Sequence, residues 1–351
     1  MTAVATPDAA RLVFAAVAGL ILLLILIIKF KVHAMISILI GAVGIGLMAG
    51  MPLSDIIGSV NEGIGNTLKG IALLVGLGSM FGAILEESGG AQTLAVTMVR
   101  KFGDEKAAWA LGITGLVVAM PVFFDAGLII LIPLAFSLAK RTKRSVLYYV
   151  IPLLAGLAVG HAFIPPTPGP IAAANTLFGE TGLNTDVNLL LVMGMGAFCS
   201  ILPLIAGYIF AVLIGKKVKA RDEADTAETT QTYEQLVASY GKLPNGWMAF
   251  APIVVPIILM GLSSALSMAG ANVPFLAFLG TPIISLTVGL LLGVVMLGMS
   301  GKMGEFYDIT NETLKTVGPI LFVTAAGGVL GKVISESTLI NFIKNNATAL
   351  E

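Results

Sequence analysis

Long apolar runs recur along the whole chain, and they constrain the fold more than any other feature. A run of about 17 to 25 apolar residues is long enough to cross a bilayer as a helix. The predicted spans are Leu12–Ile28, Ala34–Gly50, Gly70–Leu85, Val187–Ile214, Trp247–Met268, Phe275–Met299 and Thr316–Ile334. Only 11% of the residues are charged and the mean hydropathy is +0.97, against about 25% charged in soluble domains. The sequence therefore excludes a soluble globule and predicts an all-α polytopic membrane protein.

The charged, sulfur-containing and imidazole side chains exclude several other classes of protein. The 20 basic and 20 acidic residues cancel, so no net charge favours a nucleic acid as partner. One cysteine, Cys199, excludes an internal disulfide, and one cysteine with two histidines excludes a Cys/His zinc cluster. We expect no metal and no cofactor. The sequence also contains no nucleotide-binding loop of the P-loop type, and we expect a transporter rather than an enzyme.

The basic residues predict the orientation of the spans. If the short loop with Lys29 and Lys31 faces the cytoplasm, 16 of the 20 basic residues lie on that side, in agreement with the positive-inside rule. The basic residues expected outside are Arg11, Lys69, Lys332 and Lys344. This orientation puts the N-terminus outside and requires the apolar region Ala107–Ala139 to begin and end on the cytoplasmic side. That region is then either a re-entrant hairpin or two full crossings.

The region Ala107–Ala139 is interrupted by the segment Met120–Gly127, which contains Asp125. A carboxylate at membrane depth is costly and by default marks a functional site. Because desolvation raises the pKa of a carboxyl group, Asp125 is a candidate for proton coupling. The alternative is that Asp125 caps the following half-helix by accepting hydrogen bonds from the N–H groups of Leu128 or Ile129. The two roles are compatible.

A second interruption, His161–Pro170, breaks the apolar region Leu147–Leu177. It contains four prolines, which remove backbone donors and prevent helix continuity: Pro165, Pro166, Pro168 and Pro170. Unwound backbone at membrane depth is tolerated only where it is buried in protein or lines an aqueous cavity. The interruption therefore predicts a substrate site, although a proline kink that only shapes helix packing is the alternative.

The residues around this second interruption suit a small hydroxylated carboxylate. A helix that resumes at Ile171–Asn175 would direct its positive N-terminal end at an anion. The candidate substrate-binding residues are Phe163, Pro165, Pro166, Thr167, Pro168, Gly169, Pro170 and Asn175. His161 is a candidate proton relay or substrate ligand. A buried histidine that hydrogen-bonds a helix carbonyl is the other interpretation of His161.

An internal repeat links the two halves of the chain. Ser37–Gly41 (SILIG) resembles Ser285–Gly289 (SLTVG), and the glycines Gly78 and Gly82 correspond to Gly327 and Gly331. An odd number of crossings separates the two copies, which predicts inverted repeats with broken helices, an ion-transporter-like architecture. We expect a first transmembrane bundle over residues 1–214, a cytoplasmic linker over 215–246 and a partial second bundle over 247–351. No segment of the second half resembles the two interruptions, so we expect the second repeat to be incomplete and the chain to be C-terminally truncated.

Three stretches of the chain resemble the gluconate permease (GntP-type) family, which are bacterial proton symporters for sugar acids. They are Gly63–Glu87, Met120–Pro133 and His161–Ala173. The resemblance implies proton-coupled uptake of gluconate or a related sugar acid across the inner membrane, by a multi-pass protein. It also implies that Ala107–Ala139 is a re-entrant hairpin with Asp125 near its tip. Family members often carry Glu in place of Asp125 and His in place of Thr167.

The expected partners are a small organic anion, protons and the lipid bilayer, with a homo-oligomer as a further possibility. Within transporters, the alternative substrates are other small hydroxy or amino acids such as D-serine or glycerate. A transport-incompetent fragment is a second alternative. A channel is less consistent with inverted repeats and two broken elements than alternating access is.

Overall fold

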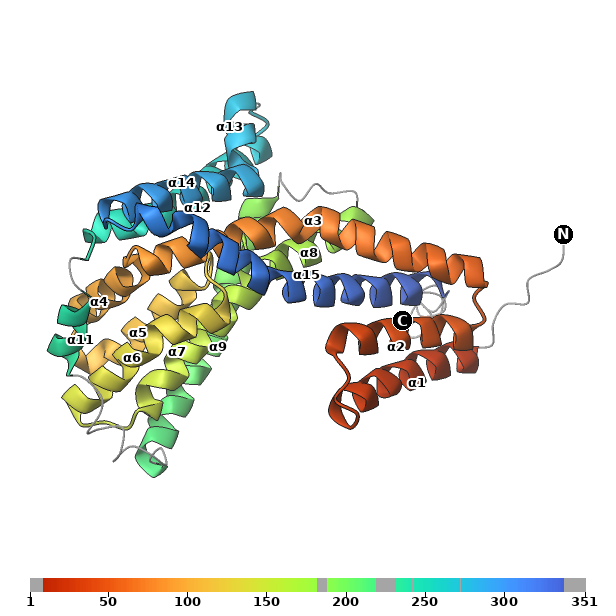
Figure 1. Ribbon diagram of the computed structural model, residues 1–351, viewed down its shortest axis with the longest axis horizontal. Coiled ribbons are helices and arrows are strands. Elements are labelled where there is room, and N and C mark those ends of the chain that lie inside the picture. Colours follow the sequence, from red (N-terminus) through yellow and green to blue (C-terminus); the bar gives the residue numbers. More distant parts are fainter. Residues whose placement is uncertain (1–8, 182–187, 219–231, 241–242, 272, 338–351) are drawn as a thin grey trace. The chain divides into compact units, whose positions relative to one another are not determined.

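The computed structural model describes residues 9–181, 188–218, 232–240, 243–271 and 273–337 (Figure 1). The ordered elements of this part of the chain are all helical, which confirms the predicted all-α polytopic class. The chain divides into two compact units. We call Met1–Ala72 with Thr316–Glu351 the first unit, and Leu73–Lys315 the second unit.

The first unit contains two short helices and parts of two long ones. Its helices are α1 (Ala9–Ile28), α2 (Ala34–Ala49), the beginning of α3 (Leu53–Glu87) and the end of α15 (Phe306–Glu336). The helices α1 and α2 approach closely because Gly41 lacks a side chain: a Cβ there would lie 3.0 Å from the Cβ of Leu23. The side chains of Ile45 on α2 and Val333 on α15 are buried together in the core of this unit.

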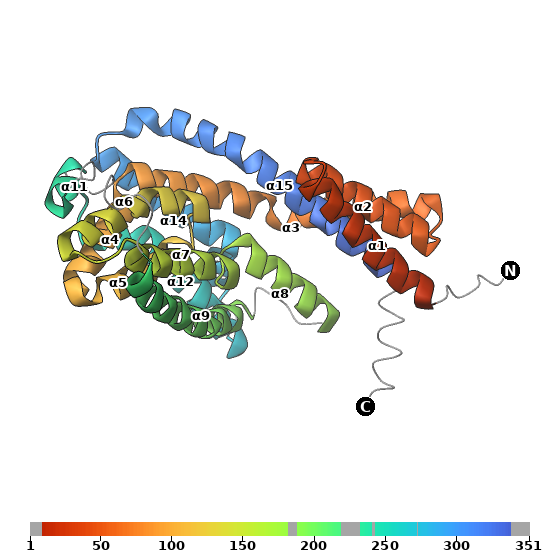
Figure 2. The ribbon, with the colours of Figure 1, turned by 90° about the horizontal axis from the view of Figure 1, so that it is seen from below.

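The second unit contains the end of α3 and most of the remaining helices. These are α4 (Gly90–Phe102), α5 (Ala107–Val118), α6 (Phe124–Thr142), α7 (Leu147–Phe163), α8 (Pro168–Thr181), α9 (Leu189–Lys217), α11 (Tyr233–Ser239), α12 (Gly246–Met268), α13 (Pro274–Gly280) and α14 (Pro282–Met299). Helix α7 packs against α5, α6 and α9, and α5, α7 and α9 run beside one another (Figures 1 and 2). Glycines permit this packing: a Cβ on Gly115 of α5 would lie 2.7 Å from the carbonyl oxygen of Leu153.

Most of the predicted spans coincide with helices. Among the described residues, six helices are long and apolar enough to cross a membrane: Ala10–Ile28, Leu53–Glu87, Leu189–Lys217, Gly246–Met268, Pro282–Met299 and Met303–Glu336. The predicted span Ala34–Gly50 is a helix of 16 residues. The predicted start of another span, Val187, lies outside the described residues. These helices confirm a multi-pass membrane protein.

Three predicted spans have other boundaries in the structure. The predicted span Phe275–Met299 is two helices, α13 and α14, which are separated at Thr281. Pro282 supplies the reason, since proline has no N–H and occupies the first turn of a helix readily. Helix α3 begins at Leu53 rather than Gly70, and α15 begins at Phe306 rather than Thr316. The prediction placed both starts too late because the first turns of these helices carry polar residues, which an apolar run does not include.

Part of the predicted linker packs on the second unit. Helix α9 continues to Lys217, and α11 buries Tyr233 and Leu236 in the hydrophobic core of the second unit. Arg141 at the end of α6 holds α11 in place, with its guanidinium carbon 4.8 Å from the centre of the Tyr233 ring and a nitrogen 3.8 Å from Glu234. Residues 219–231 and 241–242 of the predicted linker lie outside the described residues.

Two helix contacts lie at positions that the predicted repeat pairs with each other. In the second unit, the end of α3 packs on α14, where a Cβ on Gly293 would lie 3.2 Å from Ile84. In the first unit, the end of α15 packs on α2, where Val333 and Ile45 share one core. The alignment pairs Gly293 with Ile45 and Ile84 with Val333. These two contacts match the alignment, while the repeat and its inverted orientation stay predictions.

Candidate functional site

The first interruption forms the tip of a helical hairpin. Helix α5 ends at Val118 and α6 begins at Phe124. Pro121 lies between them and cannot donate a backbone hydrogen bond, so the α5 helix cannot continue through it. The tip rests on α3 at Gly82, where a Cβ would lie 3.2 Å from the Cα of Val122 and 3.3 Å from the carbonyl oxygen of Pro121. The absence of a side chain at Gly82 therefore sets how closely the tip approaches α3.

The second interruption separates α7 from α8. Helix α7 ends at Phe163 and α8 begins at Pro168, three residues before the predicted restart at Ile171. Between them, the Thr167 hydroxyl donates a hydrogen bond of 2.6 Å to the carbonyl oxygen of Ile164. Only 3% of Thr167 is exposed. A buried hydroxyl thus satisfies one of the carbonyl groups that the broken helix leaves without an intrahelical partner.

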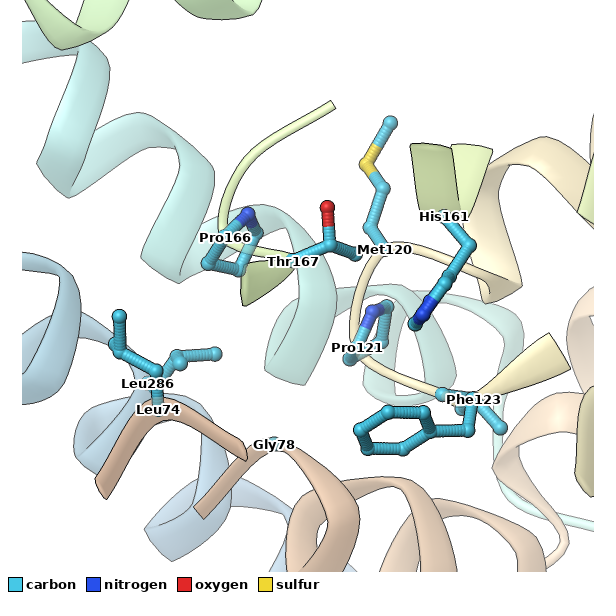
Figure 3. A pocket seen from close by; sticks show the side chains of 10 residues that line it. Leu74, Gly78, Met120, Pro121, Phe123, His161, Pro166, Thr167 and Leu286 are labelled. Carbon is cyan, nitrogen blue, oxygen red and sulfur yellow. The ribbon is translucent and has the colours of Figure 1, made fainter. Parts of the chain in front are cut away.

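The two interruptions meet at one small cavity (Figure 3). Met120, Pro121 and Phe123 line it from the hairpin tip, and Pro166 and Thr167 line it from the α7–α8 break. The cavity measures ≈ 10 Å³, which is room for about one water molecule. The predicted chain breaks therefore do border an internal space, but a sugar acid does not fit into it in this conformation.

His161 lies at the end of α7 on the wall of this cavity. Its ring faces Phe123 across the junction, with 5.1 Å between the ring centroids (Figure 3). The imidazole also hydrogen-bonds the backbone of Ala119 and interacts electrostatically with Asp125. Its Nδ1 atom is buried and has no hydrogen-bond partner in the described part of the chain. His161 thus forms a backbone hydrogen bond, as one of the two interpretations of this residue predicted. Its Nδ1 atom is left for a proton or a ligand.

Asp125 lies in the first turn of α6 and is exposed. It does not cap the helix: the N-cap position is Phe123, and no side-chain capping bond forms there. Asp125 does not line the cavity. Its carboxylate instead sits where the helix N-terminus favours a negative charge, and within electrostatic range of His161.

The structure brings only some of the predicted substrate residues to the cavity. Pro166 and Thr167 line it, as His161 does. The residues that do not line it are Phe163, Pro165, Gly169, Pro170 and Asn175. Phe163, Gly169 and Asn175 are exposed, whereas Pro165 and Pro170 are buried. Pro168 begins α8, and its side chain lies outside the described part of the structure.

Several cavity residues were not predicted from the sequence. Leu74 and Gly78 come from α3, and Leu286 comes from α14 (Figure 3). A second cavity of ≈ 10 Å³ beside the first adds Phe81 of α3 and Pro256 of α12. These residues belong to ordinary apolar runs, which give no sign of a cavity. The sequence signal that does mark the end of α3 and α14 is the predicted repeat, because both helices contain residues that it pairs with the other half of the chain.

The chain is similar to several known permeases. Residues 11–351 match the model of the GntP family permeases. An uncharacterised permease of Haemophilus influenzae is 37% identical over 328 residues, which are 90% of this chain and 66% of that protein. The Gnt-II system L-idonate transporter of Escherichia coli K12 is 32% identical, over 94% of this chain and 74% of its own length. The low-affinity gluconate transporter of Escherichia coli K12 is 33% identical, over 93% and 71%.

The chain thus spans about two thirds to three quarters of the length of these relatives. The match to the family model includes both interruptions. It confirms the predicted transporter class, as opposed to an enzyme, and supports the predicted location as a multi-pass protein of the bacterial inner membrane. The chain belongs to the GntP family of permeases.

Proposed function

We propose that this chain takes up gluconate or a related sugar acid across the bacterial inner membrane, driven by an inward proton gradient. The names of the E. coli relatives, an L-idonate and a gluconate transporter, support the substrate class. The observation that carries the proposal is the meeting of the hairpin tip and the α7–α8 break at one cavity. Broken helices that meet at such a point are typical of secondary transporters.

The ends of the broken helices favour an anionic substrate. The residues that begin α6 and α8, Phe124 and Pro168, directly follow the two unwound segments that line the cavity. Helix N-termini carry free N–H groups and a partial positive charge, which favour a carboxylate. In α8, Pro168 and Pro170 have no N–H, so Gly169 is the donor among its first three residues. The oxygen of Thr167 and the carbonyl groups of the break can accept hydrogen bonds from substrate hydroxyls. Because the cavity is small, the tip and the break must separate to admit the substrate.

His161 and Asp125 are the proposed proton-coupling groups. His161 has a buried nitrogen without a partner in the described structure, and Asp125 lies within electrostatic range of it. The Asp125 carboxylate therefore attracts the positive charge that His161 gains with a proton. Titratable side chains in membrane-embedded segments are typical of proton pathways in transporters.

We also propose that α5 and α6 form a re-entrant hairpin within a pair of inverted repeats. Helix α5 has 12 residues and is about 18 Å long, which is shorter than the hydrocarbon core of about 30 Å. This length favours the re-entrant alternative over two full crossings. The proposed bundles remain residues 1–214 and 247–351, with the cytoplasmic linker 215–246 between them.

Uptake of labelled gluconate tests the proposal. The chain is expressed in bacteria that lack their own gluconate permeases, and accumulation is measured with and without a protonophore. We expect saturable accumulation that the protonophore abolishes. Accumulation equal to that of cells with an empty vector would overturn the proposed transport, and protonophore-resistant accumulation would overturn the proton coupling.

Competition identifies the substrate. Unlabelled gluconate, idonate, glycerate and D-serine are added in turn at equal concentration. We expect gluconate and idonate to inhibit uptake of the label most strongly. Stronger inhibition by glycerate or D-serine would replace the sugar acid by the alternative substrate class.

A further inference from the structure

A third, much larger cavity lies at the other end of the α7 helix. It measures ≈ 580 Å³ and is formed by the α6–α7 corner and the end of α9. Figure 1 shows the start of α7 beside the end of α9, and these two helices pack together. Three cationic side chains line this cavity: Lys143, Arg144 and Lys216. We call it the basic pocket.

The local structure fixes the shape of the basic pocket. Lys143 adopts a left-handed conformation with φ 54°, which ends α6 and turns the chain toward α7. The guanidinium carbon of Arg144 then lies 4.9 Å from the centre of the Tyr148 ring. The hydroxyl oxygens of Tyr148 and Tyr208 are 3.3 Å apart, and Trp109 stacks on Tyr208 with centroids 4.4 Å apart. The two tyrosines that line the pocket, Tyr148 and Tyr208, are therefore fixed in place by contacts with each other, with Arg144 and with Trp109.

The basic pocket is suited to an anion. None of the residues that line it is acidic, and none of its three cations forms an ion pair within the described part of the chain. Three unpaired cations within one cavity repel one another, so a bound anion lowers their energy. The hydroxyls of Tyr148 and Tyr208 add hydrogen-bonding groups for its oxygen atoms.

The surroundings of the basic pocket indicate which anion. All three cations belong to the side that the positive-inside rule assigns to the cytoplasm. Val212 of α9 gives the pocket an apolar wall, and Ile205, Ile209 and Leu213 are exposed on the same helix within two turns of it. A ligand with a charged head and apolar chains matches this combination better than a free anion does.

We propose that the basic pocket binds the headgroup of an anionic phospholipid of the cytoplasmic leaflet. The phosphate lies among Lys143, Arg144 and Lys216, and the acyl chains lie along the exposed apolar residues of α9. Basic pockets between transmembrane helices on the cytoplasmic side are suited to such headgroups. This site is separate from the cavity at the two chain breaks, so the inference does not depend on the proposed substrate.

Native mass spectrometry of the detergent-solubilised chain tests the inference. Phosphatidylglycerol and phosphatidylcholine with the same acyl chains are titrated separately, and the first bound lipid is quantified. We expect the wild-type chain to prefer phosphatidylglycerol. The triple variant Lys143→Gln/Arg144→Gln/Lys216→Gln should lose about 100-fold in affinity for it, because each basic residue near an anionic headgroup contributes about a factor of five.

Two further variants act as controls. Lys29→Gln/Lys31→Gln/Lys106→Gln removes three exposed basic residues that the sequence assigns to the same side of the membrane, and it should keep the preference. Lys143→Arg/Lys216→Arg keeps the charges of the basic pocket and should keep the preference too. If the triple variant of the basic pocket fails to fold, the double variant Arg144→Gln/Lys216→Gln replaces it, and full binding of phosphatidylglycerol by this double variant would overturn the inference. A loss of phosphatidylglycerol binding in the charge-conserving variant would overturn it as well.

The source of the phosphate is tested by competition. Inorganic phosphate at a concentration equal to that of the lipid should displace little phosphatidylglycerol, because it cannot use the apolar surface of α9. Full displacement would overturn the lipid assignment and leave a site for free phosphate. Equal binding of the two lipids by the wild-type chain would overturn the basic pocket as an anionic site.

Discussion

The two units contain corresponding glycine pairs in different surroundings. In the second unit, Gly82 on α3 is buried under the hairpin tip. A Cβ placed on Gly78 would lie 4.0 Å from the carbonyl oxygen of Pro121. In the first unit, the corresponding Gly331 and Gly327 on α15 are exposed, with no atom of the described chain within 4 Å of a Cβ placed there. The same pair of glycines therefore contacts the hairpin tip in the second unit and is exposed in the first unit.

This difference separates two roles of the repeat. Contacts between the long helices and their neighbours, such as Ile84 with Gly293 and Val333 with Ile45, occur in both units. The hairpin tip, the α7–α8 break and the cavity they share belong to the second unit alone among the described residues. The repeated helices provide the scaffold, and the additional segments provide the chemistry. Variants at matched positions in the two units can test this division.

The titratable residues provide the largest expected difference. We expect Asp125→Asn and His161→Gln each to reduce proton-driven accumulation of gluconate at least about tenfold, since a proton-transfer group contributes about 100-fold or more where it is used. The first unit holds matched controls in Asp55, which also lies in a helix first turn, and in His33, which is exposed. Asp55→Asn and His33→Gln should leave accumulation unchanged. A variant at Asp125 that still concentrates gluconate excludes that carboxylate as a coupling group.

The glycine pair itself is the next test. Gly82→Val pushes the hairpin tip away from α3, because the Cβ alone meets Val122 at 3.2 Å. Overpacking of this kind destabilises by about 1 to 3 kcal/mol, so the melting temperature in detergent should fall and uptake should be lost. Gly331→Val places the same side chain on an open surface and should change neither. Equal effects of the two variants would remove the distinction between the units.

A smaller effect is expected from the hydroxyl at the α7–α8 break. Thr167→Val removes the donor to the buried carbonyl of Ile164, and an unsatisfied buried polar group costs about 1 to 3 kcal/mol. In the first unit, Ser37 donates to the carbonyl of His33, which also accepts the backbone N–H of Ser37. Ser37→Ala should therefore cost less, and thermal unfolding of both variants measures the difference. A larger loss for Ser37→Ala would contradict the special role of the break.

The smallest effect concerns an ion pair of the second unit. The hydrogen bond to Glu87, at 2.7 Å, raises the pKa of Lys302. The pair stabilises the fold fully below the ordinary pKa of lysine, about 10.4, and this contribution is lost as the pH rises through the raised pKa of Lys302. Because both side chains are partly exposed, Lys302→Met should cost only about 0.5 kcal/mol. Thermal unfolding at neutral pH and above the raised pKa should show the difference only at neutral pH, and a difference that persists at high pH would exclude the ion pair as its cause.

The sequence predicted most of the membrane spans because long apolar runs mark them, but it placed the starts of α3 and α15 too late and joined α13 to α14. It missed α4 and α11, since short amphipathic helices are stabilised by tertiary packing such as that of Tyr233 and Leu236. Proline content located both chain breaks, and these two segments do meet. Their contact with Leu74 and Gly78 of α3 could not be predicted, because it depends on the tertiary arrangement of the helices. The exposure of Asp125 and the distance of Asn175 from the cavity are also tertiary properties.

The size of the cavity between the chain breaks has a consequence for the transport cycle. Space for about one water molecule means that the described conformation does not hold the solute at the two chain breaks. Binding of a sugar acid there therefore requires the hairpin tip and the α7–α8 break to move apart. The rate of turnover would then depend on how easily Pro121 and Pro166 part, and a disulfide that tethers these two segments should arrest the cycle without unfolding the bundle.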